Sequence, residues 1–143
     1  MSDDPLYRDR DDLRTEFVAA LGFLTRLPPH WLGLSDHIGP TRGETMTRAA
    51  RLFPLVGVLV GLVGGLVLAL ALALDLPPLV AGGAAVAAAM VVTGAMHEDG
   101  LADTVDGFGG GTTAEAKLAI MRDSRIGTYG ASALILSILL RAA

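Results

Sequence analysis

The chain contains no cysteine, which excludes both a disulfide framework and a thiolate metal site. Any metal ion would therefore be held by oxygen or imidazole ligands. Basic residues are fewer than acidic ones: the chain has 11 lysines and arginines and 15 aspartates and glutamates, which give a formal net charge of -4. Nucleic-acid binding needs a basic surface, so this balance argues against nucleic acid as a partner.

Charged residues are also scarce. They make up 18% of the chain, whereas 52% of the residues are hydrophobic and the mean hydropathy is +0.53. A soluble domain of this length is normally more polar. Residues 1–14 alternate acids and arginines without an apolar segment, so they do not match a cleavable signal peptide. Composition predicts a membrane protein that begins with a solvated tail.

Two uncharged apolar segments are long enough to cross a bilayer. Residues 53–74 form the first predicted span, because about 1.5 Å of rise per residue matches a hydrocarbon core of about 30 Å. Residues 79–96 form the second, and the Asp-Leu-Pro-Pro sequence at 75–78 predicts a hairpin turn between them. Residues 128–143 read as the start of a third span that is too short to cross. We expect an all-α, polytopic transmembrane helical bundle that is truncated at its C-terminus.

Two features of the N-terminal half predict helix packing. Gly57, Gly61 and Gly65 recur every four residues and predict a face of the first span against which another helix packs. The stretch 13–27 carries apolar residues at helical spacing and predicts an amphipathic helix. This helix either lies in the membrane interface or packs on the protein's own cytoplasmic face, and the sequence leaves both alternatives open.

Basic residues flank the predicted pair of spans on both sides. Arginines precede the first span, and Lys117, Arg122 and Arg125 follow the second, whereas the turn between the spans has none. Because basic residues mark the cytoplasmic side, both flanks are predicted to be cytoplasmic. The predicted organisation is one multi-pass domain in the cell inner membrane, with a cytoplasmic tail and interfacial helix at 1–52 and a cytoplasmic acidic loop at 97–127.

The predicted loop contains an acidic cluster. Asp99, Asp103 and Asp106 are spaced i, i+4 and i+7, so a helix would place the three carboxylates within about 60° of its circumference. Adjacent carboxylates repel one another unless a cation neutralises them, and hard divalent cations prefer oxygen ligands. The spacing favours a Mg²⁺ site, with Ca²⁺ as a weaker candidate. The alternative is a solvated acidic face of a helix.

The roles of two residues beside this cluster stay open. His97 is a ligand, a general base or a residue that ends the span, and the last role is favoured because Mg²⁺ prefers oxygen. Glu98 lies about 100° away from the aspartate face, so a ligand role is not predicted for it.

A second polar block follows the acidic cluster. The glycines at 109–111 carry no nucleotide-binding fingerprint, and Thr113 is the predicted N-cap of a helix over 114–121. The residues that follow this helix are Arg122, Asp123, Ser124 and Arg125. The arginines and the serine of this set suit phosphate oxygens, while its aspartate suits a metal ion or a proton. Alternatively, the arginines anchor the next span on its cytoplasmic side.

Four sequence blocks, taken in order, resemble the cobalamin synthase family, the adenosylcobinamide-GDP ribazoletransferases or cobalamin-5'-phosphate synthases. The blocks lie at 23–28, 53–57, 97–107 and 120–128, and they read FLTRLP, FPLVG, HEDGLADTVDG and IMRDSRIGT. Each block is weak alone, but four in this order are specific. The resemblance covers residues 17–140.

The resemblance implies a magnesium-dependent membrane transferase of cobalamin biosynthesis. It would join adenosylcobinamide-GDP to α-ribazole or its 5'-phosphate and release GMP, with adenosylcobalamin or its 5'-phosphate as product, in the last step of nucleotide-loop assembly. Asp99, Asp103 and Asp106 would hold Mg²⁺. The implied catalytic set is Asp123, Arg122, Ser124 and Arg125. The partners would be these substrates and membrane lipid, with a homo-oligomer as an open alternative.

Three other functions are alternatives. A CDP-alcohol phosphotransferase-like membrane enzyme needs an Ala-Arg pair, whereas Ala102 is followed here by Asp103. A divalent-cation carrier would place carboxylates along an ion path, but paired arginines add nothing to such a path. The third alternative is a membrane anchor without catalysis.

Overall fold

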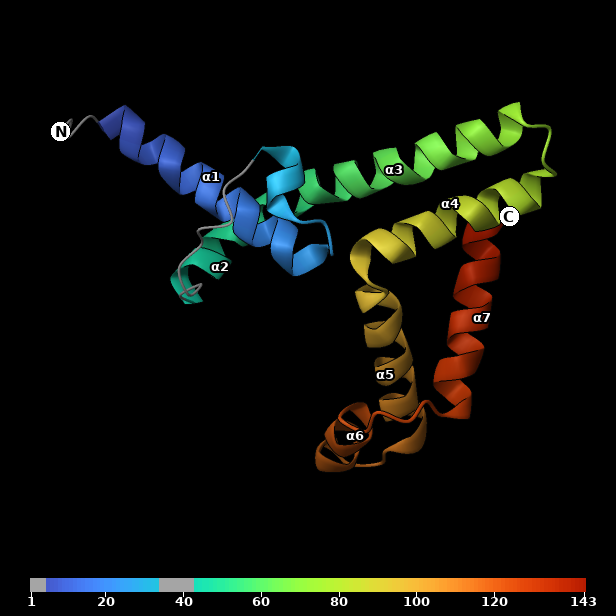
Figure 1. Ribbon diagram of the computed structural model, residues 1–143. Helices are drawn as coiled ribbons and strands as arrows, with labels where there is room; N and C mark the ends of the chain where they lie inside the picture. Colours follow the sequence, from blue (N-terminus) through green and yellow to red (C-terminus); the bar gives the residue numbers. More distant parts are fainter. Residues whose placement is uncertain (1–4, 34–42) are drawn as a thin grey trace. The chain divides into compact units, whose positions relative to one another are not determined.

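The computed structural model describes residues 5–33 and 43–143 of the chain (Figure 1). Within those ranges the backbone forms helices and short connections, and no strand occurs. The chain divides into two compact units, Met1–Leu62 and Val63–Ala143. The predicted all-α class is confirmed for the described residues. Part of the predicted solvated tail, residues 1–4, lies outside them.

The first unit consists of short helices that precede and begin a long apolar helix. Its elements are α1 (Pro5–Leu24), η1 (Pro29–Leu32), α2 (Gly43–Ala49), η2 (Ala50–Leu52) and the start of α3 (Phe53–Ala73). A core of buried Leu21, Ala49 and Val56, with two alanines of α1, joins α1, α2 and α3. α1 begins at Pro5, whereas the sequence predicted an amphipathic helix that begins at residue 13. At the end of α1 the Thr25 hydroxyl donates a hydrogen bond of 2.8 Å to the Leu21 carbonyl.

Four consecutive apolar residues in the C-terminal half of α1 are packed on the protein itself. Residues 18–21 are buried, and Phe23 stacks on Phe53 with ring centroids 5.8 Å apart. The buried carboxylate of Glu16 pairs with Arg51 at 2.6 Å. These contacts favour the second of the two alternatives for this segment, an amphipathic helix packed on the protein.

α3 corresponds to the predicted first span. It ends one residue before the predicted boundary at Leu74, and with α2 and η2 it forms an apolar helical stretch of 28 residues, Met46–Ala73. By length and composition this stretch is able to cross a membrane. The predicted turn follows it, with Asp75 at a positive φ of 57°.

Within the second unit, one glycine of α3 approaches α4. It is Gly64, whose Cβ would stand 3.4 Å from the Ala85 carbonyl oxygen, whereas a Cβ on Gly65 of the predicted stripe would meet no atom of another element within 4 Å. In this unit the helix contact is therefore displaced by one residue from the stripe. Gly57 and Gly61 lie in the first unit, and their packing against another helix stays a prediction.

The predicted second span, residues 79–96, is not one straight helix. α4 (Pro78–Thr93) ends at Gly94 and Ala95, whose φ angles are 65° and 57°, and α5 (Met96–Gly110) leaves at a bend of 92°. A left-handed backbone costs a residue with a Cβ roughly 1–2 kcal/mol, so this alanine is strained. α4 and α5 count as a second crossing only if the bent pair is one broken span.

The segment predicted as a loop at 97–127 is mainly helical. After α5 come α6 (Ala114–Met121) and α7 (Thr128–Ala142). The Thr113 hydroxyl accepts a hydrogen bond of 3.2 Å from the Ala116 N–H, which confirms the predicted N-cap. Figure 1 shows α7 running back beside α5 to reach α4, with α6 against the C-terminal end of α5. These contacts pack the two polar blocks together.

Candidate functional site

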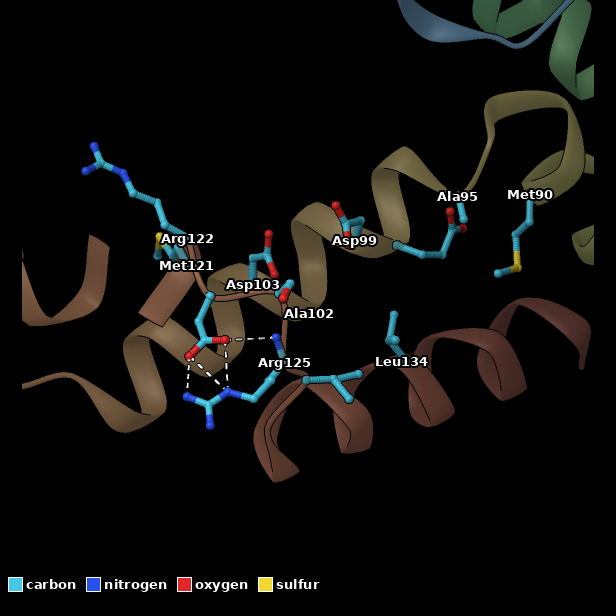
Figure 2. A pocket seen from close by; sticks show the side chains of 13 residues that line it. Met90, Ala95, Asp99, Ala102, Asp103, Met121, Arg122, Arg125 and Leu134 are labelled. Atoms are coloured by element: carbon cyan, nitrogen blue, oxygen red, sulfur yellow. Dashed lines mark hydrogen bonds and ion pairs between the residues drawn. The ribbon is translucent and has the colours of Figure 1, made fainter. Parts of the chain in front are cut away.

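α5 carries the predicted metal ligands, and it is helical as their spacing requires. Asp99 is exposed, Asp103 is partly buried and Asp106 is 8% exposed. Asp99 and Asp103 line a cavity of about 470 Å³, which we call the aspartate cavity. Figure 2 shows these two residues on consecutive turns of α5. Asp106 does not line this cavity.

The connection between α6 and α7 forms the opposite wall of the aspartate cavity. The residues that it contributes are Arg122, Asp123, Ser124, Arg125 and Ile126. The structure thus brings the predicted phosphate-binding set to two of the predicted metal ligands. In Figure 2, the Arg122 side chain extends away from Arg125.

Asp123 and Arg125 form a close ion pair within this wall. The Arg125 side chain donates to Asp123 Oδ2 at 2.6 Å, and its backbone N–H donates to Oδ1 at 3.1 Å. These hydrogen bonds, first those of the guanidinium and then that of the backbone, lower the pKa of Asp123 from 3.8 to about 2. So acidic a carboxylate is a weak base at neutral pH. Arg125 retains further N–H donors for a ligand, because a guanidinium carries five.

Asp106 binds the start of α7. Its carboxylate accepts a hydrogen bond of 2.7 Å from the Gly127 N–H and one of 2.8 Å from the Gly130 N–H. Gly127 is the N-cap residue of α7 and has no side chain with which to cap the helix. Asp106 therefore satisfies two free N–H groups of α7 from another helix, and its negative charge also suits the positive end of the helix dipole.

The glycines at the start of α7 are required by this contact. A Cβ on Gly127 would stand 2.5 Å from Asp106 Oδ1. A Cβ on Gly130 would overlap the same carboxylate and stand 2.9 Å from the Ala102 carbonyl oxygen. The close approach of α5 and α7 thus depends on both glycines.

The comparisons with known proteins cover most of the chain. A family model described as Cobalamin-5-phosphate synthase matches residues 16–143. The chain belongs to this family. No solved structure matches it.

Curated relatives named adenosylcobinamide-GDP ribazoletransferase are similar to the chain. The relative from Ralstonia nicotianae is 51% identical over 133 residues, which cover 92% of this chain and 48% of the relative. Those from Rhizobium etli and Xanthobacter autotrophicus are 48% and 51% identical over 132 and 134 residues, covering 92% and 93% of this chain and 49% of each relative. The chain therefore spans about half the length of these curated relatives.

Two of the four blocks that resemble the cobalamin-5-phosphate synthase family form the walls of the aspartate cavity. The block at 97–107 lies on α5, and the block at 120–128 joins α6 to α7. The blocks at 23–28 and 53–57 lie in the first unit, where Phe23 stacks on the first residue of α3. The second unit by itself thus contains the candidate site of this family member.

The donor set of the aspartate cavity fits Mg²⁺ in part. Among the described residues, no three His, Cys, Asp or Glu side chains come together as a group that could hold a metal ion. Mg²⁺ is commonly bound by one or two carboxylates, several waters and the phosphates of a substrate. Asp99 and Asp103, on consecutive turns beside one cavity, fit that mode of binding.

Sequence reasoning missed the pairing of Glu98. This residue is 6% exposed, and its Oε1 accepts a hydrogen bond of 2.6 Å from Arg141. The pair joins the first turn of α5 to the last turn of α7. The sequence does indicate that α7 needs a capping group from another segment, because its N-cap residue is a glycine. No local sequence pattern indicates that Glu98 pairs with Arg141. His97 is exposed and does not line the aspartate cavity.

Proposed function

We propose that this chain carries the magnesium and diphosphate site of an adenosylcobinamide-GDP ribazoletransferase. The curated relatives with this name support the proposal. The structural observation that supports it is one cavity in which Asp99 and Asp103 lie opposite Arg122 and Arg125. Carboxylates that bind a cation and arginines that bind phosphate oxygens are the groups that phosphoryl transfer requires.

The proposed reaction transfers a phosphate-linked group to an alcohol. A ribose hydroxyl of α-ribazole, or of its 5'-phosphate form, attacks the phosphorus that bears cobinamide. A new P–O bond forms there, the P–O bond to GMP breaks, and GMP leaves with the electron pair while the hydroxyl proton passes to water. Bound Mg²⁺ would neutralise charge on the diphosphate oxygens.

Each residue of the cavity has a role in this proposal. Asp99 and Asp103 hold the cation, and Arg122 and Arg125 donate to phosphate oxygens. The Ser124 hydroxyl adds a neutral donor. We assign Asp123 to orienting Arg125 and not to accepting the proton, because its pKa is about 2. Its predicted role as a further metal ligand is compatible with this orientation.

Asp106 was also predicted from the sequence as a metal ligand. Its two oxygens each accept a backbone hydrogen bond, from Gly127 and from Gly130. We therefore propose that Asp106 positions α7 and that the cation is held without it. The predicted ligand role is the competing outcome in the test given in the Discussion.

We further propose that the protein crosses the cell inner membrane several times, with the aspartate cavity on the cytoplasmic side. The length of α3 and the basic residues outside the predicted turn support this orientation. The chain contains no cysteine, so a single introduced cysteine is its one site for labelling by a maleimide. A membrane-impermeant maleimide should label Thr112→Cys from the cytoplasmic side and Leu76→Cys from the opposite side. Labelling of both from one side contradicts the proposal.

The first test is Mg²⁺-dependent release of GMP from adenosylcobinamide-GDP and α-ribazole by the full-length protein in membranes. Asp103→Asn should reduce release by at least about 100-fold, because it removes a cation ligand. Asp75→Asn is the matched control, since residue 75 lies in the hairpin turn with a φ of 57°, a conformation that asparagine tolerates. No release by the unaltered protein, or release that is indifferent to Asp103, would favour the cation carrier or the anchor.

A further inference from the structure

A second cavity, of about 490 Å³, adjoins the aspartate cavity. Its own lining includes Ile120, Thr128 and Tyr129, and we call it the tyrosine cavity. Asp123, Arg125 and the neighbouring Ile126 line both cavities. The two cavities therefore meet at this ion pair.

The tyrosine cavity differs from its neighbour in chemistry. Arg122, Asp99 and Asp103 line the aspartate cavity and are absent from the lining of the tyrosine cavity. The acid that lines only the tyrosine cavity is Asp106, and both of its oxygens already accept backbone hydrogen bonds. What the tyrosine cavity offers away from the ion pair is an aromatic ring, isoleucine side chains and a threonine hydroxyl. These groups suit a flat, largely apolar ligand with a polar end.

The ring of Tyr129 is held in place and still accessible. It lies against Gly109, where an added Cβ would stand 2.7 Å from two ring carbons. The residue is nevertheless 58% exposed. A ring that is supported by backbone on one side and open on another provides a stacking surface for an aromatic base.

We propose that the tyrosine cavity is the acceptor subsite and binds the aromatic base of α-ribazole against Tyr129. The inference rests on the proposed function and adds the location of its second substrate. Transfer between two substrates requires their reacting atoms to be held about 3 Å apart, and adjoining cavities meet this need. The ribose of the acceptor lies toward Asp123 and Arg125, where the diphosphate bound in the aspartate cavity is within reach. A volume of about 490 Å³ is in the range of small-molecule sites.

The kinetic test separates the two substrates. Tyr129→Leu should raise the KM for α-ribazole at least about tenfold, since it removes the stacking ring. The KM for adenosylcobinamide-GDP and the Mg²⁺ requirement should change less than about twofold, because the aspartate cavity is intact. Tyr129→Phe keeps the ring and should retain a KM for α-ribazole near that of the unaltered protein. Running α-ribazole and its 5'-phosphate in parallel shows which form the subsite prefers.

The matched control is Phe108→Leu. Phe108 is 65% exposed, lies under the Lys117 ammonium at 4.3 Å from the ring centroid, and lines neither cavity. Removing this ring should leave both KM values unchanged. A rise in the KM for adenosylcobinamide-GDP alone in Tyr129→Leu, or no change in either KM, would overturn the proposal.

A second measurement uses the unaltered protein, so it does not depend on how a variant folds. An aryl-azide analogue of α-ribazole, activated by light in membranes, should label a peptide that contains Tyr129, and excess α-ribazole should prevent the labelling. Labelling confined to other segments would overturn the acceptor subsite. This measurement does not require catalytic turnover, so it is independent of the test for GMP release. Labelling at Tyr129 without GMP release would reject the proposed transferase function and keep the binding site for α-ribazole. GMP release with labelling only in other segments would support the transferase function and reject the acceptor subsite.

Discussion

Asp103 and Asp106 lie one turn apart on α5, and their carboxylates have different surroundings. Asp103 is partly buried and lines the aspartate cavity, whereas Asp106 is 8% exposed and accepts hydrogen bonds from two backbone N–H groups of α7. The difference arises because Gly127 and Gly130 let α7 approach the C-terminal half of α5. Carboxylates on one face of a helix therefore do not all have the same role, since the neighbouring element decides what each carboxylate contacts.

The largest expected effect comes from closing the space that Asp106 occupies. Gly130→Ala should lower the free energy of unfolding by about 3 kcal/mol, because the new methyl group would overlap the Asp106 carboxylate and crowd the Ala102 carbonyl. Gly100→Ala, on α5, is the matched control. A Cβ there would meet no atom of another element within 4 Å, so it should raise stability by up to about 1 kcal/mol. Chemical unfolding in detergent micelles measures the free energy of unfolding of both variants. Equal changes in the two variants would contradict the close contact between Gly130 and Asp106.

The next effect separates the two aspartates directly. Asp106→Asn should lower the free energy of unfolding by about 2 kcal/mol, because an amide offers one acceptor oxygen for the N–H groups of Gly127 and Gly130. The Mg²⁺ concentration for half-maximal GMP release should change less than about twofold. In Asp103→Asn the same concentration should rise at least about tenfold. Equal rises in both variants would restore Asp106 as the metal ligand that the sequence predicted.

The smallest effect concerns Asp123, a carboxylate whose partner is only two residues away. Its pKa lies at about 2, below the usual 3.8, so any stabilisation from its pair with Arg125 is present above pH 3.8 and is lost as the pH falls through about 2. Arg125→Gln should return the pKa toward 3.8. Carboxyl ¹³C NMR of the protein in micelles measures this shift. A pKa that does not respond to Arg125→Gln would show that another group lowers it.

Local patterns predicted several parts of the fold. The charge-free run of α3 and the Asp-Leu-Pro-Pro turn after it follow from hydropathy and from the restricted backbone of proline. Thr113 is the N-cap of α6, because a hydroxyl at that position pairs with a free N–H of the first turn. The spacing of Asp99 and Asp103 placed them beside one cavity, since helix geometry sets their angle.

The sequence by itself determined the helices α3 and α6 and which residues of a helix share a face, because these depend on neighbours along the chain. The Asp106 contact with α7 and the pairing of Glu98 with Arg141 were decided only by tertiary structure. Each of these depends on where a distant segment comes to lie. Hydrogen bonds and close packing between such segments form only when the helices are assembled, and a local sequence pattern does not identify the partner residue.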